Sequence, residues 1–208
     1  IHNIKKRFIE NFQFFISSIA GHVSIHGGLI ILASFVNNTI LGEFALAQKI
    51  ALLMRMVPVF FTQAILQNAT VLFKKDKIEF NSYVNRIFIT GLSITLGMGL
   101  TVIILSKWII FLLAGSFVIY SETILKILAF IPFLSMLNFN NMVKILVDEK
   151  KHLLTRATWI TAIIMLVFAT IGSYYYGGYG LSIALVLTEI VSFIVYSILL
   201  IKNKHERA

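Results

Sequence analysis

The sequence predicts an all-α integral membrane protein built as a bundle of six transmembrane helices. Of its 208 residues, 58% are hydrophobic and 13% are charged, whereas soluble domains carry about 25% charged residues. Six stretches are apolar over about 20 residues or more, the length that crosses a bilayer. The connections between them alternate between basic and nearly uncharged, as expected when successive helices cross in opposite directions.

The six predicted helices span residues 12–36, 43–73, 87–106, 120–147, 154–175 and 179–201. Lys and Arg gather before the first helix, after the second, after the fourth and after the sixth. The positive-inside rule therefore predicts that both ends of the chain lie in the cytoplasm. The net charge of +9 fits basic loops and anionic lipid headgroups better than nucleic acid. The start IHNIKKR lacks a methionine and leads into an apolar stretch too long for a signal peptide, so we expect an internal segment of a longer protein.

The first predicted helix combines a seam of small residues with a polar stripe. At about 100° per residue, one narrow arc holds Ser17, Gly21, Ser24 and Gly28, a pattern that lets another membrane helix approach closely. Beside it lie Asn11, Ser18, His22 and His26. The two histidines have a spacing compatible with metal binding, but no third ligand is near in sequence. Cavity lining, or burial of a hydrogen-bonded histidine, is the preferred interpretation.

The second predicted helix carries a mixed polar face along most of its length. Within an arc of about 140° on the helical wheel it places Gln48, Lys49, Arg55, Thr62, Gln63, Gln67 and Thr70. Pro58, near the middle, predicts a kink.

Two cations on this helix have different explanations. Lys49 either reaches the outer interface along its flexible stem or lines a cavity. Arg55 lies nearly two turns deeper, too deep for that explanation. It requires an anionic partner, a water-filled cavity or an anionic ligand, and its planar guanidinium suits phosphate.

The middle of the chain offers packing and surface features. Residues 74–86 are predicted to form an amphipathic surface segment or a solvated loop. In the third helix, Ser93, Gly97 and Thr101 predict a packing face. In the fourth helix, the acid and base four residues apart, Glu122 and Lys126, predict a weak surface ion pair, and Asn141 and Lys144 are interpreted as interfacial anchors.

The sixth predicted helix holds an acid, Glu189, close to its midpoint. Ser182, Glu189 and Tyr196 recur at intervals of seven and define one face. Glu189 is either the partner of a membrane arginine, a protonated and hydrogen-bonded carboxyl, or a proton-coupling group.

The sequence shows no constellation typical of an enzyme or of a cofactor site. There is no cysteine, which excludes disulfides, thiol catalysis and cysteine-based metal sites. Clustered carboxylates, glycine-rich phosphate loops and nucleophile motifs are also missing from the sequence. We therefore expect no enzymatic activity, no resident metal and no cofactor.

Several motifs occur in a characteristic order. LGEFALAQKI, followed by a segment ending QAILQNATVLF, resembles the stretch G-x-[YF]-[SA]-x-A-x-K of Wzx-type polysaccharide flippases, a family of the MATE-like exporter superfamily. Three later stretches are also similar: IIFLLAGSFVIYSETILKILAF, the loop after VKILVDEKKH, and YGGYGLSIALVLTEIVSF with its Gly-rich turn and TE pair. The resemblance covers essentially all of the chain and rests on order and spacing.

The resemblance implies a fold, a function and partners. Family members have twelve helices in two six-helix bundles around a central cavity, and residues 1–208 would be the second bundle, with 12–36 and 43–73 lining the cavity. The family moves undecaprenyl-pyrophosphate-linked sugar repeat units across the bacterial inner membrane for O-antigen, capsule or lipopolysaccharide synthesis. The implied partners are this lipid-linked oligosaccharide, membrane lipids and the N-terminal bundle. Lys49 and Arg55 become candidate contacts for pyrophosphate or acidic sugars.

Three other functions remain open at the level of sequence. One is a drug/cation antiporter of the same fold, although such sites favour acidic cavity residues. Another is a membrane-embedded polysaccharide polymerase or acyltransferase, which would need a catalytic cluster or a large outer loop. The third is a scaffold subunit, which has no need of a polar stripe.

Overall fold

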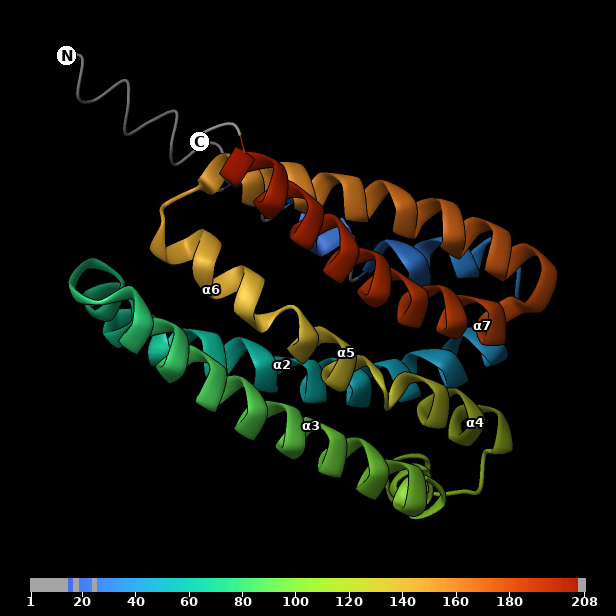
Figure 1. Ribbon diagram of the computed structural model, residues 1–208. Helices are drawn as coiled ribbons and strands as arrows, with labels where there is room; N and C mark the ends of the chain where they lie inside the picture. The colour runs from blue at the N-terminus through green and yellow to red at the C-terminus, as the bar shows by residue number, and fades with distance from the viewer. Residues whose placement is uncertain (1–14, 17–18, 24–25, 206–208) are drawn as a thin grey trace.

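The computed structural model describes residues 15–16, 19–23 and 26–205, and all regular elements within them are helices (Figure 1). Helical turns within 15–33 precede six further helices. These are α2 (Asn38–Lys75), α3 (Lys77–Ala114), α4 (Ile119–Leu128), α5 (Ile131–Leu137), α6 (Phe139–Val147) and α7 (Lys151–His205).

The expected fold class is confirmed in its general form. Four helical stretches are long and apolar enough to cross a membrane: Asn38–Lys75, Lys77–Ala114, Ile119–Leu137 and His152–Asn203. The predicted count of six helices is not confirmed. The single helix predicted over 120–147 is divided into α4, α5 and α6, and the two helices predicted over 154–201 lie within α7, which folds back on itself at Gly177.

The connection between α2 and α3 is a single residue, Asp76. Its side-chain Oδ1 accepts hydrogen bonds from the backbone N–H groups of Ile78 (2.7 Å) and Glu79 (3.2 Å), which caps α3. The alternative of a solvated loop over 74–86 is therefore wrong, whereas the amphipathic segment is consistent with buried Phe80 and Val84 and an otherwise mostly exposed surface. The aspartate ends one helix and starts the next within one residue, so residues 77–86 form the first turns of α3.

The fourth predicted helix is broken because of Pro132. A proline ring collides with the carbonyl four residues earlier, and here that carbonyl belongs to Leu128, the last residue of α4. The second break, at Asn138, lies where the side-chain Nδ2 of this residue donates to Ser192 Oγ of α7 at 3.2 Å. The proline is visible in the sequence, but the partner that accompanies the second break lies 54 residues away.

The packing face of α3 differs from the predicted one. Ser93, Gly97 and Thr101 are exposed, whereas Gly91, Thr95 and Gly99 are buried. A Cβ atom on Gly99 would lie 2.8 Å from the backbone oxygen of Ala129, at the α4–α5 break. The absence of a side chain at Gly99 thus lets the interrupted backbone lie directly against α3.

The reversal within α7 depends on glycines. Gly177 has φ +57°, in the left-handed region that other residues rarely adopt. The backbone N–H of Gly178 donates to Tyr120 Oη of α4 at 3.0 Å. A Cβ atom on Gly172 would lie 2.6 Å from the backbone oxygen of Gly180, so the two arms meet closely next to the turn.

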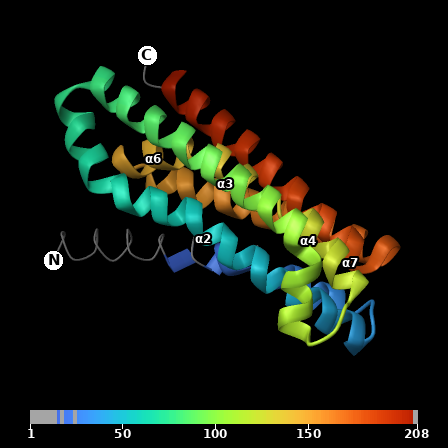
Figure 2. The ribbon, with the colours of Figure 1, turned by 90° about the horizontal axis from the view of Figure 1, so that it is seen from below.

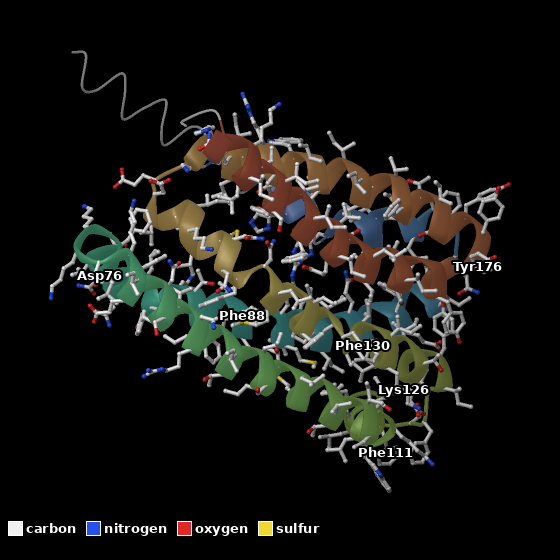
Figure 3. All side chains as sticks on the ribbon, in the orientation of Figure 1. Asp76, Phe88, Phe111, Lys126, Phe130 and Tyr176 are labelled. Atoms are coloured by element: carbon white, nitrogen blue, oxygen red, sulfur yellow. The ribbon has the colours of Figure 1, made fainter. Side chains whose placement is uncertain are left out.

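The bundle has two ends, which Figures 1 and 2 show; lysines gather at one, called the basic end, and Tyr174, Tyr175 and Tyr176 lie at the other, called the aromatic end. The α2–α3 corner, the α6–α7 connection and the end of α7 share one end; the start of α2, the α3–α4 loop and the turn at Gly177 share the other. In Figure 3, Asp76 lies at the first end and Phe111, Lys126 and Tyr176 lie at the second. The basic end carries Lys74, Lys75, Lys77, Lys150 and Lys202. Which end faces the cytoplasm stays a prediction.

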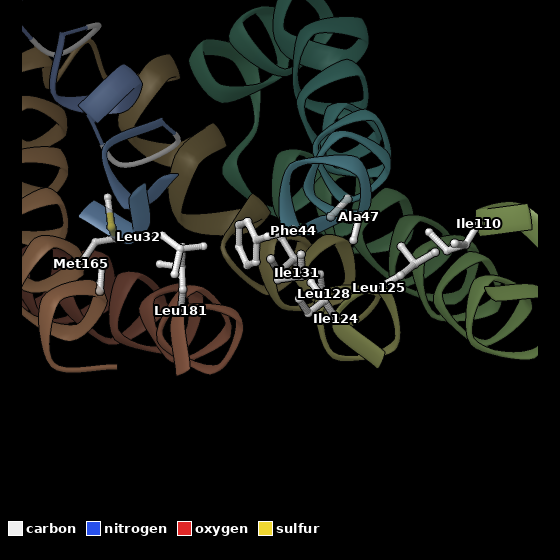
Figure 4. Packing of buried hydrophobic residues seen from close by; sticks show 12 residues of the cluster. Leu32, Phe44, Ala47, Ile110, Ile124, Leu125, Leu128, Ile131, Met165 and Leu181 are labelled. Carbon is white, nitrogen blue, oxygen red and sulfur yellow. The ribbon is translucent and has the colours of Figure 1, made fainter. Parts of the chain in front are cut away.

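The buried apolar residues form separate clusters along the bundle. The largest joins the helical turns before α2, the start of α2, α4 and both arms of α7, through residues such as Leu32, Phe44, Leu128 and Leu181 (Figure 4). A second lies toward the basic end. On α2 the two clusters are separated by the stretch between Ala51 and Ile65, which contains Arg55.

Candidate functional site

The two deepest charges of the sequence, Arg55 and Glu189, form an ion pair. Arg55 Nη2 lies 2.7 Å from Glu189 Oε1, which joins α2 to the second arm of α7. Arg55 lies near the middle of α2, whose 38 residues extend about 57 Å at 1.5 Å per residue. The pair is therefore roughly 25–30 Å from either end of that helix.

The two partners differ in burial. The Glu189 side chain is 8% exposed, while that of Arg55 is 31% exposed. A charge at membrane depth is tolerated when it is paired or when it borders water. Glu189 has its partner inside the protein, whereas the guanidinium also retains surface that a solute can reach.

A cavity of about 140 Å³ borders the pair, and polar side chains line part of it although most of its lining surface is apolar. Its polar lining comes from α2 and from both arms of α7, namely Gln48, Arg55, Thr158, Thr161, Thr188, Glu189, Ser192 and Tyr196. Leu128 and Ile131, on either side of the α4–α5 break, complete it. This volume accommodates several water molecules, which suits the hydroxyl groups around it.

A larger cavity, of about 470 Å³, borders the same pair on the side of α5 and α6. Leu52, Arg55, Glu189, Ser192 and Tyr196 line both cavities. The rest of its lining is mostly apolar, including Met56, Val59, Phe139, Met142, Leu146 and Leu154. The site thus has two compartments of mixed lining that meet at one guanidinium and one carboxylate: the smaller, called the polar cavity for its hydroxyl groups, and the larger, called the apolar cavity for its methionine and leucine side chains.

Hydrogen bonds hold the broken α5–α6 segment and the two arms of α7 around this site. Asn138 bonds to Ser192, and Asn141 Nδ2 donates to Ser197 Oγ at 2.9 Å. Asn141 therefore joins α6 to α7, a contact that its interpretation as an interfacial anchor did not include. The hydroxyl groups of Tyr196 and Thr158 lie 3.1 Å apart and link the two arms.

The other predicted site residues lie at varying distances from the ion pair. Gln48 is buried and lines the polar cavity, and Gln63 lines the apolar one. Lys49 and Gln67 are exposed and line neither. The predicted polar arc of 140° is wider than the part of α2 that faces the site. Residues at the edges of this arc therefore point away from the site.

His22 and His26 are also exposed, with ring centroids 6.1 Å apart, and line neither cavity. The preference for buried or cavity-lining histidines is therefore not supported by their positions. Among the described residues, no group of three or more His, Asp or Glu lies close enough to hold a metal.

Several residues of the site were not selected from the sequence. These are Asn138, Thr158, Thr161, Thr188 and Ser192. Thr188, Ser192 and Tyr196 recur at intervals of four, and Thr158 and Thr161 are three apart, so each set shares one helical face. This periodicity is the sequence signal that could have identified these residues. It is weak, because hydroxyl residues are common in membrane helices and the contact between the two sets depends on the reversal at Gly177.

Comparison of the chain with protein-family models, with curated proteins and with solved structures finds no match.

Proposed function

We propose that this chain is half of a membrane transporter that moves an anionic, lipid-linked oligosaccharide, a polyprenyl-pyrophosphate-linked repeat unit, across the bacterial inner membrane. The proposal rests on the position and the exposure of the Arg55 side chain. Its guanidinium lies midway along a membrane helix, borders two cavities of mixed polar and apolar lining, and is 31% exposed. A lipid-linked anion likewise combines a charged, polar group with an apolar chain.

Recognition of the substrate proceeds by exchange of partners on Arg55. Glu189 occupies the guanidinium in this structure at 2.7 Å. A phosphate presents the same kind of oxygen acceptors and makes short, charge-assisted bonds to guanidinium. The phosphate binds by replacing the carboxylate, and Glu189 then turns to the hydroxyl group of Ser192, which borders the same cavities and accepts from Asn138 in this structure. Arg55 is therefore paired with an anion both before and after the substrate binds.

The broken segment supports transport rather than a purely structural role. Interrupted helices at membrane depth occur where the backbone is buried in protein or lines a cavity, and transporters build substrate sites beside them. Here the break between α4 and α5 borders the polar cavity, and the break at Asn138 borders the apolar one.

The proposal also assigns an arrangement in the membrane. The helical turns before α2, then α2, α3, the combined α4–α6 segment and the two arms of α7 make six passages, with the basic end in the cytoplasm. This bundle is the second of two in a twelve-helix transporter. Exposed polar residues of α2, among them Lys49 and Gln67, face the first bundle across the central cavity.

A drug/cation antiporter is the nearest competing function. Cationic substrates need an accessible acid, but the Glu189 side chain is only 8% exposed, whereas that of its partner Arg55 is 31% exposed. The geometry therefore favours an anionic substrate.

Transport by the full-length protein tests the proposal. Proteoliposomes containing a fluorescent polyprenyl-pyrophosphate oligosaccharide report flipping, and we expect Arg55→Ala to abolish it while Arg86→Ala, a loss of the same charge on the exposed side of α3, does not. Undiminished flipping by Arg55→Ala removes Arg55 from the mechanism. Export of a cationic dye without flipping supports the antiporter, and turnover of the oligosaccharide without translocation supports an enzyme.

A further inference from the structure

A second polar cleft lies at the basic end, apart from the ion pair. It has a volume of about 380 Å³ and lies between the first turns of α3 and α6. Its lining consists of Asn81, Ser82, Val84, Asn85, Asn140 and Lys144, and none of these borders the cavities at Arg55.

The polar side chains of this cleft have no partners within the described part of the protein. Lys144 Nζ makes no ion pair or hydrogen bond there, although Lys150, six residues later, is paired with Asp148 at 2.6 Å. Asn140 Oδ1 is inaccessible to solvent and receives no hydrogen bond. Its neighbour Asn141 is by contrast bonded to both Asn138 and Ser197.

The buried acceptor Asn140 Oδ1 calls for a donor, because buried polar groups are ordinarily satisfied, whereas Asn81, Ser82, Asn85 and Lys144 are exposed and open to an external ligand. Asn81, Asn85 and Asn140 supply both donors and acceptors, and Ser82 adds a hydroxyl group. Lys144 supplies a single positive charge. This set matches a phosphate group that carries hydroxyl groups nearby.

The position of the cleft indicates where such a phosphate comes from. The adjoining corner of α2 and α3 carries Lys74, Lys75 and Lys77, which attract the anionic surface of a bilayer. One turn farther along α3, toward the middle of the bundle, Ile89 is 55% exposed and offers an apolar contact for an acyl chain.

The geometry points to a binding site for an anionic phospholipid, with the phosphate at Lys144 and a hydroxyl-bearing headgroup, such as that of phosphatidylglycerol, among the asparagines. The bound lipid links α3 to α6, the last part of the broken segment. This site is independent of the transported substrate and of the proposed transport function.

Native mass spectrometry of the full-length protein in detergent, titrated with phosphatidylglycerol or phosphatidylcholine, tests the site. We expect Lys144→Gln to lower the affinity for phosphatidylglycerol about five- to tenfold, from the contribution of one basic residue at a membrane surface. Lys107→Gln, a loss of the same charge at the aromatic end, should leave it unchanged. Equal affinities of Lys144→Gln and the unchanged protein overturn the assignment.

Two further experiments test the specificity of the site for a membrane phospholipid. Asn85→Asp places a like charge beside the phosphate on an exposed position, so it should weaken phosphatidylglycerol binding without unfolding the protein. Glycerol phosphate and a polyprenyl phosphate are added as competitors. If either displaces phosphatidylglycerol at equal concentration, the site binds a soluble phosphate or the transported lipid, and the assignment to a membrane phospholipid is wrong.

Discussion

Removing either charge of the Arg55–Glu189 pair should destabilise the protein, and removing both should destabilise it by less than the sum of the two single losses. The variants are Arg55→Gln, Glu189→Gln and the double variant, each of which keeps a side chain of similar length that can form hydrogen bonds. Together with the unchanged protein they form a double-mutant cycle, which isolates the interaction between the two residues.

The magnitude follows from the burial of the pair. Breaking a fully buried ion pair costs about 3–5 kcal/mol, while exposed pairs contribute about 0–1 kcal/mol. With Glu189 at 8% and Arg55 at 31% exposure, the pair lies between these limits. We expect a loss of about 2 kcal/mol for each single variant, larger for Arg55→Gln because the carboxylate it leaves behind is the more buried partner.

The double variant should lose about 1 kcal/mol less than the sum of the single variants, because two glutamines can bond to each other. For a chain of this size, 2 kcal/mol corresponds to a decrease in Tm of about 4–8 °C. Thermal unfolding in detergent, followed by far-UV circular dichroism, measures these values.

A matched control is the ion pair of Glu122 and Lys126, which lies one helical turn apart at 2.6 Å with the lysine side chain 44% exposed. The same cycle of Gln variants there should give a coupling of about 0.3–0.5 kcal/mol. Strictly additive losses at Arg55 and Glu189, or a coupling no larger than that of the control, would refute the argument that membrane depth and burial make this pair strong.

Two further predictions concern the broken segment. Gly99→Ala should lower Tm by several degrees because its Cβ would lie 2.8 Å from the Ala129 carbonyl oxygen, whereas Gly97→Ala meets nothing within 4 Å and should raise Tm slightly through higher helix propensity; equal shifts would contradict the packing of α3. Asn141→Ala should destabilise the protein by about 0.6–1.7 kcal/mol through loss of the bond to Ser197, as measured for hydrogen bonds between membrane helices. Thermal unfolding checks it, and an unchanged Tm would return Asn141 to a surface role.

The all-helical fold class and the charged residues within apolar stretches could be predicted from the sequence, because both depend on local properties. Long apolar stretches select helices in any membrane, and an arginine or glutamate within them stands out by type alone. The i,i+4 pair of Glu122 and Lys126 was likewise predictable from spacing and is present. That Arg55 and Glu189 face each other could be raised only as one option, since it depends on how α2 and α7 pack.

The packing face of α3 shows why a helical wheel is insufficient here. The predicted set beginning at Ser93 and the buried set beginning at Gly91 are offset by two residues, which places them about 200° apart on the helix. Both sets consist of small residues at intervals of four. The buried set is the one in which Gly99 lies against the carbonyl oxygen of Ala129, beside the break before Pro132, and that break lies on another helix.

The breaks and the polar lining of α7 needed tertiary information. Pro132 could have indicated the first break, yet proline is tolerated within α2, which continues through Pro58. The hydroxyl groups of Thr158 and Tyr196 meet because α7 reverses at Gly177 and brings residues 38 apart within 3.1 Å. No local sequence pattern predicts the contact between these two hydroxyl groups.

The most direct test of the central claim, that an anionic substrate binds by replacing Glu189 on Arg55, is the affinity of a polyprenyl pyrophosphate for the purified full-length protein and for two variants. Competition predicts opposite signs: Arg55→Gln should weaken binding at least about tenfold through loss of a charge-assisted bond, whereas Glu189→Gln should strengthen it because the guanidinium no longer has a competing carboxylate. Weaker binding by both variants to the same extent, or no change in either, would contradict the account.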